Sequence, residues 1–96
     1  MKRNINEIAD MIIEYRNSQG WQVNDTPNAL SKSILIEAIE LLINFKDDCK
    51  NVHIENVKEE LADILMYTLT MSSDLNINIK NEILRSLAKK YNIKME

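Results

Sequence analysis

Glycine and proline, the residues that most often interrupt regular structure, occur only once each in this chain of 96 residues. Tight β-hairpins depend on such turn residues, so their scarcity argues against an all-β fold. Apolar residues instead recur at steps of three and four, the spacing that keeps side chains on one face of an α-helix. The sequence therefore predicts an all-α protein with one domain over residues 1–96.

Four amphipathic helices account for the spacing of apolar residues. We predict helices over residues 5–18, from 27 to about 46, from 54 to about 73, and from about 78 to 91. Asn4 and Thr26 are suited to cap the first two helices, and Pro27 is suited to the first helical position, where no N–H is needed. Residues 20–26 and 47–53 are predicted to be loops.

The balance of charge and the few metal-binding side chains limit the partners of the chain. The net charge of -3 argues against a nucleic-acid binder. No apolar run approaches the roughly 20 residues that span a bilayer, and the basic start leads into Glu7 rather than into a signal peptide. Cys49 and His53 are too few for a zinc site. We therefore expect a soluble, cytoplasmic protein with no nucleic-acid or membrane partner.

The predicted helices carry more apolar side chains than one buried stripe requires. The residues outside the main apolar faces are Ile13, Ile36, Ile39, Ile43 and Met66. Burial between copies of the chain accounts for this excess, whereas scattered apolar surface residues, which are common in monomers, are the alternative. We expect a four-helix bundle-like fold assembled as a homodimer or homotetramer.

Two acidic pairs on consecutive predicted helices are the candidate metal-binding residues of the sequence. Glu37 and Glu40 lie three residues apart on the second helix, and Glu60 and Asp63 do so on the third. Both pairs border an apolar stripe, so the four carboxylates converge if both stripes face one core. Converging carboxylates repel one another unless a cation neutralises them, and hard oxygen ligands suit Mg²⁺ or Mn²⁺. A solvated helix face is the alternative for either pair.

The two acidic pairs resemble the signature of the MazG-like, all-α nucleoside triphosphate pyrophosphohydrolases. That family has an ExxE pair on one helix and an ExxD pair on the next, and 19 residues separate the two pairs here. The resemblance extends over about residues 16–91. It includes Gly20-Trp21 ahead of Thr26-Pro27, and Tyr67 four residues after the aspartate of the second pair.

Two stretches depart from the family's pattern. Family members often have aromatic and His residues in the loop after the tryptophan, where this chain has Val23-Asn24-Asp25. The last helix ends Lys89-Lys90-Tyr91 without the proline that often follows, and Asn78 stands where an aspartate often begins that helix.

The resemblance implies a Mg²⁺-dependent hydrolase, with Mn²⁺ as a substitute, that converts a nucleoside or deoxynucleoside triphosphate to the monophosphate and pyrophosphate. Glu37, Glu40, Glu60 and Asp63 would be the metal ligands and catalytic residues. The metal would activate a water for attack on the α-phosphorus, with one carboxylate as general base. The alternatives are a non-catalytic helical module that binds nucleotide or protein, and a hydrolase of a phosphoribosyl-ATP-like nucleotide.

The resemblance also implies substrate contacts, each of which has a purely structural alternative. Trp21 would stack on the base or cap the core, and Tyr67 would touch sugar or base or simply pack. Lys32 would reach a phosphate or remain solvated. Lys89 and Lys90 would bind phosphate or complement a helix dipole, and Asn78 would join the site or cap its helix.

Overall fold

A computed structural model describes residues 2–46 and 52–94, which form four α-helices and one short 3₁₀ turn. The elements are α1 (Ile5–Ser18), η1 (Trp21–Val23), α2 (Pro27–Ile43), α3 (Ile54–Asp74) and α4 (Ile79–Tyr91). This part of the chain contains no strand, so the all-α class is confirmed.

The helices α1 and α2 begin where their capping residues predicted them to begin. Asn4 accepts a hydrogen bond from the Glu7 backbone N–H at 3.0 Å, and the Glu7 carboxylate accepts one in return from the Asn4 N–H at 3.2 Å. Thr26 caps α2 by accepting from the Ala29 N–H at 3.1 Å. Pro27 then occupies the first helical position, as expected.

The ends of α2 and α3 differ from the prediction. α2 stops at Ile43, three residues early, and the Asn44 side chain donates to the Glu40 carbonyl at 3.0 Å. α3 continues through the serines expected to break it, because the Ser72 hydroxyl donates to the Leu69 carbonyl at 2.9 Å. Of the second predicted loop, residues 47–51, with Cys49, lie outside the described residues.

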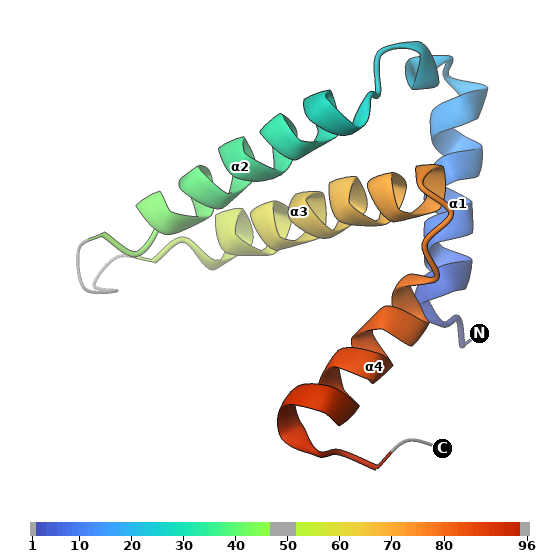
Figure 1. The fold of residues 1–96 in the computed structure, drawn as a ribbon. Coiled ribbons are helices and arrows are strands. Elements are labelled where there is room, and N and C mark those ends of the chain that lie inside the picture. Colours follow the sequence, from blue (N-terminus) through green and yellow to red (C-terminus); the bar gives the residue numbers. More distant parts are fainter. Residues whose placement is uncertain (1, 47–51, 95–96) are drawn as a thin grey trace.

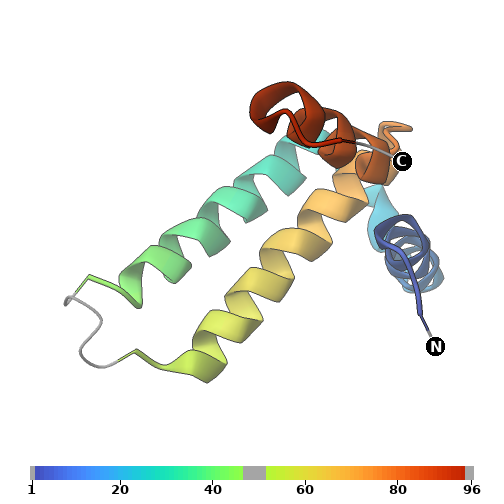
Figure 2. The ribbon, with the colours of Figure 1, turned by 90° about the horizontal axis from the view of Figure 1, so that it is seen from below.

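Two of the four helices, α2 and α3, form a hairpin, and α1 and α4 are joined to it at one end. α2 and α3 run antiparallel, α1 crosses the end of α3, and α4 leaves that junction on its own path (Figures 1 and 2). The buried apolar side chains are Ala9 of α1, Leu30 at the start of α2 and Leu69 near the end of α3, at 2–4% exposure. The described core is therefore small and sits at the junction.

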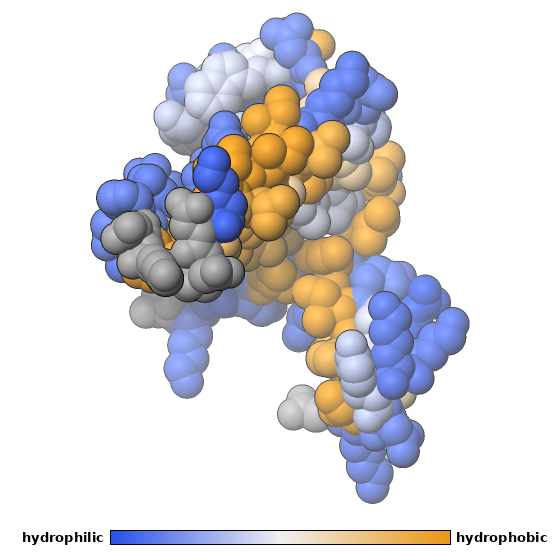
Figure 3. Space-filling model, turned by 90° about the vertical axis from the view of Figure 1, so that its left-hand side faces the viewer, coloured by the Kyte–Doolittle hydropathy of each residue, from blue (hydrophilic) through white to orange (hydrophobic). Residues whose placement is uncertain are grey.

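The single chain is too open to be a compact domain. Its Cα radius of gyration is 15.6 Å, against about 12.5 Å for a compact chain of this length. Its accessible surface is 7691 Å², against about 5,700 Å² for a compact monomer of 11.2 kDa. Apolar side chains gather over the hairpin and along one side of α4 (Figure 3). Within the described residues, the four helices do not enclose a common core.

The exposed apolar residues fit one expectation and correct another. Of the five residues predicted to lie outside the main faces, Ile36, Ile39, Ile43 and Met66 are 45–57% exposed, whereas Ile13 is half-buried. The spacing of apolar residues in the second helix also predicts a buried stripe of Leu30, Ile34, Ala38, Leu41, Leu42 and Phe45. Leu42 is 68% exposed, so this prediction is wrong for Leu42 in a single chain. Across residues 2–46 and 52–94, no helix has both the length and the apolar character that a bilayer crossing needs.

Candidate metal and nucleotide site

The seam between α2 and α3 positions most of the predicted acidic residues. Ile34 of α2 and Ile64 of α3 are half-buried where the two helices pack. Glu37, Glu60 and Asp63 are also half-buried. Glu37 is three residues from Ile34, Glu60 is four residues from Ile64, and Asp63 is three residues from Glu60, so each shares a helix side with its neighbour in this set. Glu40 is exposed, one turn further along α2. The carboxylates thus come from two helices and border one seam.

The carboxylates of the seam act on one another electrostatically. Burial raises the pKa of Glu37, and the negative charges of Glu40, Asp63 and Glu60 raise it further, in that order. In the described part of the chain, none of the four forms an ion pair with Lys or Arg. Glu37, Glu40, Glu60 and Asp63, which we call the acidic cluster, are therefore a region of negative charge that no Lys or Arg of the described residues compensates.

The carboxylate groups of the acidic cluster do not surround a common point at which an ion could bind. Among the described residues, no three His, Cys, Asp or Glu side chains are close enough to hold a metal. Glu60 accepts a hydrogen bond from the Asn44 side chain at 2.7 Å, which ties the end of α2 to α3 beside the cluster. Four carboxylates supply the hard oxygen donors that Mg²⁺ prefers, so the donor set fits this ion. Asn44 was not anticipated, since a polar residue after a helix carries no such signal.

A pocket of about 410 Å³ opens beside the acidic cluster, between α1, the η1 loop and α3. Its aromatic lining consists of Tyr15, Trp21 and Tyr67, and Asp63 belongs both to the pocket and to the cluster. The rings of Tyr15 and Trp21 meet edge to face, with centroids 5.7 Å apart. Flat apolar walls next to carboxylates suit a ligand with an aromatic ring at one end and phosphates at the other.

The negative charges of the acidic cluster act on Tyr67, which lines this pocket. Burial raises the pKa of the Tyr67 hydroxyl, and the charges of Glu37, Asp63 and Asp25 raise it further. The phenol therefore stays protonated at neutral pH and can donate a hydrogen bond to a ligand.

Arg16 fixes the loop that carries Trp21. Its guanidinium is buried, with 7% of the residue exposed, and it donates to the two oxygens of Asp74 at 2.7 and 2.8 Å. The Asp74 hydrogen bond is the largest cause of its raised pKa. Asp25, at the end of the loop, lies 3.5 Å from the same group. The sequence does not predict the contact between Arg16 and Asp74, because 58 positions separate the two residues.

Removing Asp74 is expected to destabilise the fold. In Asp74→Ala the buried guanidinium of Arg16 loses its bidentate partner, which typically costs about 3 kcal/mol. Urea denaturation followed by circular dichroism measures the loss. The control is Glu82→Ala, which removes an exposed ion pair with Arg85 on α4 and should change stability by less than about 1 kcal/mol. Equal, small effects of the two changes would contradict a structural role for the Arg16 pair.

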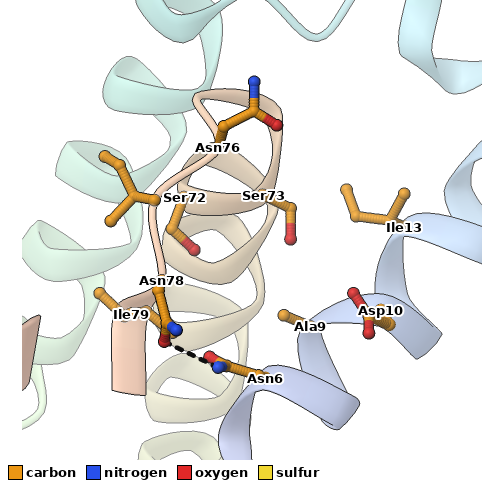
Figure 4. Close-up of a pocket in the computed structure, with 10 residues that line it drawn as sticks. Asn6, Ala9, Asp10, Ile13, Ser72, Ser73, Asn76, Asn78 and Ile79 are labelled. Atoms are coloured by element: carbon orange, nitrogen blue, oxygen red, sulfur yellow. Dashed lines mark hydrogen bonds between the residues drawn. The ribbon is translucent and has the colours of Figure 1, made fainter. Parts of the chain in front are cut away.

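The remaining predicted substrate residues do not meet the acidic cluster within one chain. Lys32 is exposed on α2, and Lys89 and Lys90 are exposed in the last turn of α4, which leads away from the hairpin (Figure 1). Asn78 caps α4 and accepts a hydrogen bond from the Asn6 side chain at 2.8 Å. It lines a separate pocket of about 510 Å³ between α1 and the turn before α4 (Figure 4). Of the predicted contacts, Trp21 and Tyr67 are the two beside Asp63.

Comparison of the chain with protein-family models, with curated proteins and with solved structures finds no match.

The repulsion at Glu37 predicts how stability depends on pH when no metal is present. Because the folded state raises this pKa, it binds the proton more tightly than the unfolded chain, so ionised Glu37 destabilises the fold. This cost is absent below the ordinary glutamate pKa and grows as pH rises through the raised value. Glu37→Gln should therefore melt at a higher temperature than wild type near pH 7 in EDTA, and the gain should shrink toward about pH 4.

A glutamate outside the cluster serves as the control for this measurement. Glu59 is exposed on α3, next in sequence to Glu60, and Glu59→Gln should leave the melting temperature nearly unchanged at either pH. A destabilising effect of Glu37→Gln near pH 7 in EDTA would mean that the carboxylates do not repel one another.

Proposed function

We propose that this chain is a Mg²⁺-dependent nucleotide pyrophosphohydrolase of the MazG-like kind. It would convert a nucleoside or deoxynucleoside triphosphate to the monophosphate and pyrophosphate. The observation that carries the proposal is the uncompensated group of Glu37, Glu40, Glu60 and Asp63 beside a pocket with aromatic walls. The ExxE and ExxD spacing in the sequence is independent support for the same four residues.

A nucleotide in this site would contact two environments, with its base in the aromatic pocket and its phosphates at the acidic cluster. The rings of Trp21 and Tyr67 would hold the base in the pocket, which directs the phosphates toward Asp63 and the acidic cluster. Triphosphate and carboxylates are both negative, so the two associate only with a cation between them.

The four carboxylates would hold Mg²⁺, with Mn²⁺ as a substitute. The bound ion would neutralise phosphate charge and lower the pKa of a water molecule. A water attacks the α-phosphorus, the bond from that phosphorus to the bridging oxygen breaks, and pyrophosphate leaves. The proton of the water passes to a carboxylate of the cluster acting as general base.

We further propose that copies of the chain assemble through the exposed apolar surface, as a homodimer or homotetramer. The surface exceeds that of a compact monomer by about 2,000 Å², whereas a standard interface buries about 800 Å² per partner. Pairing of two α2–α3 hairpins would give a four-helix bundle across the interface.

Pyrophosphate release from a panel of nucleotides tests the proposed activity. The panel holds the common ribonucleoside and deoxyribonucleoside triphosphates and phosphoribosyl-ATP, each with Mg²⁺, with Mn²⁺ and with EDTA. We expect pyrophosphate and the monophosphate to form in equal amounts with a metal and neither to form in EDTA. Binding without turnover would favour a non-catalytic nucleotide-binding module, and release of orthophosphate would point to a different bond.

A further inference from the structure

The pocket beside the acidic cluster contains a carboxylate that the proposed reaction does not use. Asp25 lines this pocket together with the rings of Tyr15, Trp21 and Tyr67. Its side chain is 28% exposed, so a ligand in the pocket has access to it. Its negative charge acts on the Tyr67 hydroxyl, which lines the same pocket.

Asp25 retains most of its capacity to accept hydrogen bonds. Its ion pair within the described residues is with Arg16, at 3.5 Å, which is longer than a good N–H···O hydrogen bond. The same guanidinium lies 2.7 and 2.8 Å from the oxygens of Asp74, and its Nε–H donates to Asn17 at 3.2 Å. Two carboxylates thus share one cation, and the closer contacts belong to Asp74. Asp25 is therefore open to further hydrogen-bond donors.

A carboxylate in a base pocket distinguishes nucleobases by their edges. Cytosine, adenine and guanine present an exocyclic amino group, which donates hydrogen bonds. Uracil and thymine present a carbonyl oxygen where cytosine has its amino group. An ionised carboxylate only accepts, so it binds the amino group through a charge-assisted hydrogen bond and repels the carbonyl oxygen.

We propose that Asp25 makes the pocket selective for nucleotides whose base carries an amino group, over those of uracil and thymine. This inference rests on the proposed function, since it takes the pocket beside Asp63 as the one that receives the base. Asp25 lies in the loop after Trp21, where the sequence departs from the MazG-like pattern. The selectivity is therefore a property of this chain's own loop.

Binding of cytidine and uridine tests the pocket without metal or hydrolysis. The two nucleosides differ at position 4, where cytidine has an amino group and uridine a carbonyl oxygen, and at N3, which carries a proton only in uridine. Trp21 is the one tryptophan of the chain and lines the pocket, so its fluorescence reports binding. We expect wild type to bind cytidine about tenfold more tightly than uridine. Asp25→Asn should bring the ratio close to one, because an amide both donates and accepts.

A matched variant and a second substitution make the result specific. Asp10→Asn removes a carboxylate from α1 outside this pocket and should keep the tenfold ratio. Asp25→Glu, which retains the negative charge, should keep part of the preference for cytidine over uridine. If circular dichroism shows that Asp25→Asn loses helix, Asp25→Ser replaces it as the neutral variant. Equal binding by wild type, or an unchanged ratio in a folded neutral variant, would overturn the proposal.

Failure of the selectivity and failure of the hydrolase give different results. If wild type prefers cytidine but releases no pyrophosphate from any nucleotide, the hydrolase is wrong and the base selectivity stands. If wild type hydrolyses CTP and UTP with equal kcat/KM and binds the two nucleosides equally, the hydrolase stands and the selectivity is wrong.

Discussion

Asp63→Ala is expected to lower Mg²⁺-dependent pyrophosphate release by at least about 100-fold, more than the usual loss of a residue that only supports a metal ligand. Asp63 belongs both to the acidic cluster and to the aromatic pocket, so its removal takes away a metal ligand at the point where phosphates and base would join. Glu40→Ala should have a similar effect, although Glu40 is exposed and contributes nothing to the core. Pyrophosphate release at saturating Mg²⁺ measures both.

The control separates loss of the site from loss of the fold. Glu59→Ala removes an exposed carboxylate of α3 that is not one of the four proposed ligands and should retain activity within about twofold, because surface substitutions rarely change stability. All three variants should keep the helix content of wild type by circular dichroism. Full activity in both Asp63→Ala and Glu40→Ala would show that the acidic cluster is not the catalytic site.

The parts of this structure that follow from local rules could be predicted from the sequence. Capping by Asn4 and Thr26 depends on residues three positions away, and the helical period alone places Glu37 and Glu60 next to the seam. At both misplaced helix ends, the side chains of Asn44 and Ser72 hydrogen-bond to a helix carbonyl in the preceding turn. They differ in that Asn44 also donates to Glu60 of α3, a contact between helices, whereas the Ser72 hydroxyl stays within α3.

The rest depends on contacts between distant residues, which a helical period does not encode. Arg16, Asp25 and Asp74 come together only where α1, the loop and the end of α3 meet, so no local pattern in the sequence predicts their contacts. The exposure of Leu42 could not be predicted from helical spacing either. Spacing identifies an apolar face but does not say whether that face meets the same chain or another copy.

One exposed apolar surface of the hairpin lies opposite the acidic cluster. Leu42 follows Glu37 by five residues, and Leu65 follows Glu60 by five, which is about 140° around a helix. The exposed apolar residues that the helical period places on this side of the hairpin, at 47–68% exposure, are Leu35, Leu42, Ile54, Leu61 and Leu65. We name this set the apolar hairpin face. Two copies packed through it would leave both acidic clusters open to substrate.

Leu42→Asp is expected to weaken assembly at least about 1,000-fold, because it would bury an unpaired charge in the interface at a cost of about 4 kcal/mol. Sedimentation velocity at micromolar concentration should show wild type as a dimer or tetramer and the variant as a monomer. Val23→Asp places the same charge on an apolar residue of the loop, 76% exposed and off the hairpin face, and should leave assembly intact. Because the single chain buries so little, we expect the Leu42→Asp monomer also to lose helix content at temperatures where wild type is folded. A monomeric wild type with full helix content would show that the apolar hairpin face is not an interface between copies of this chain.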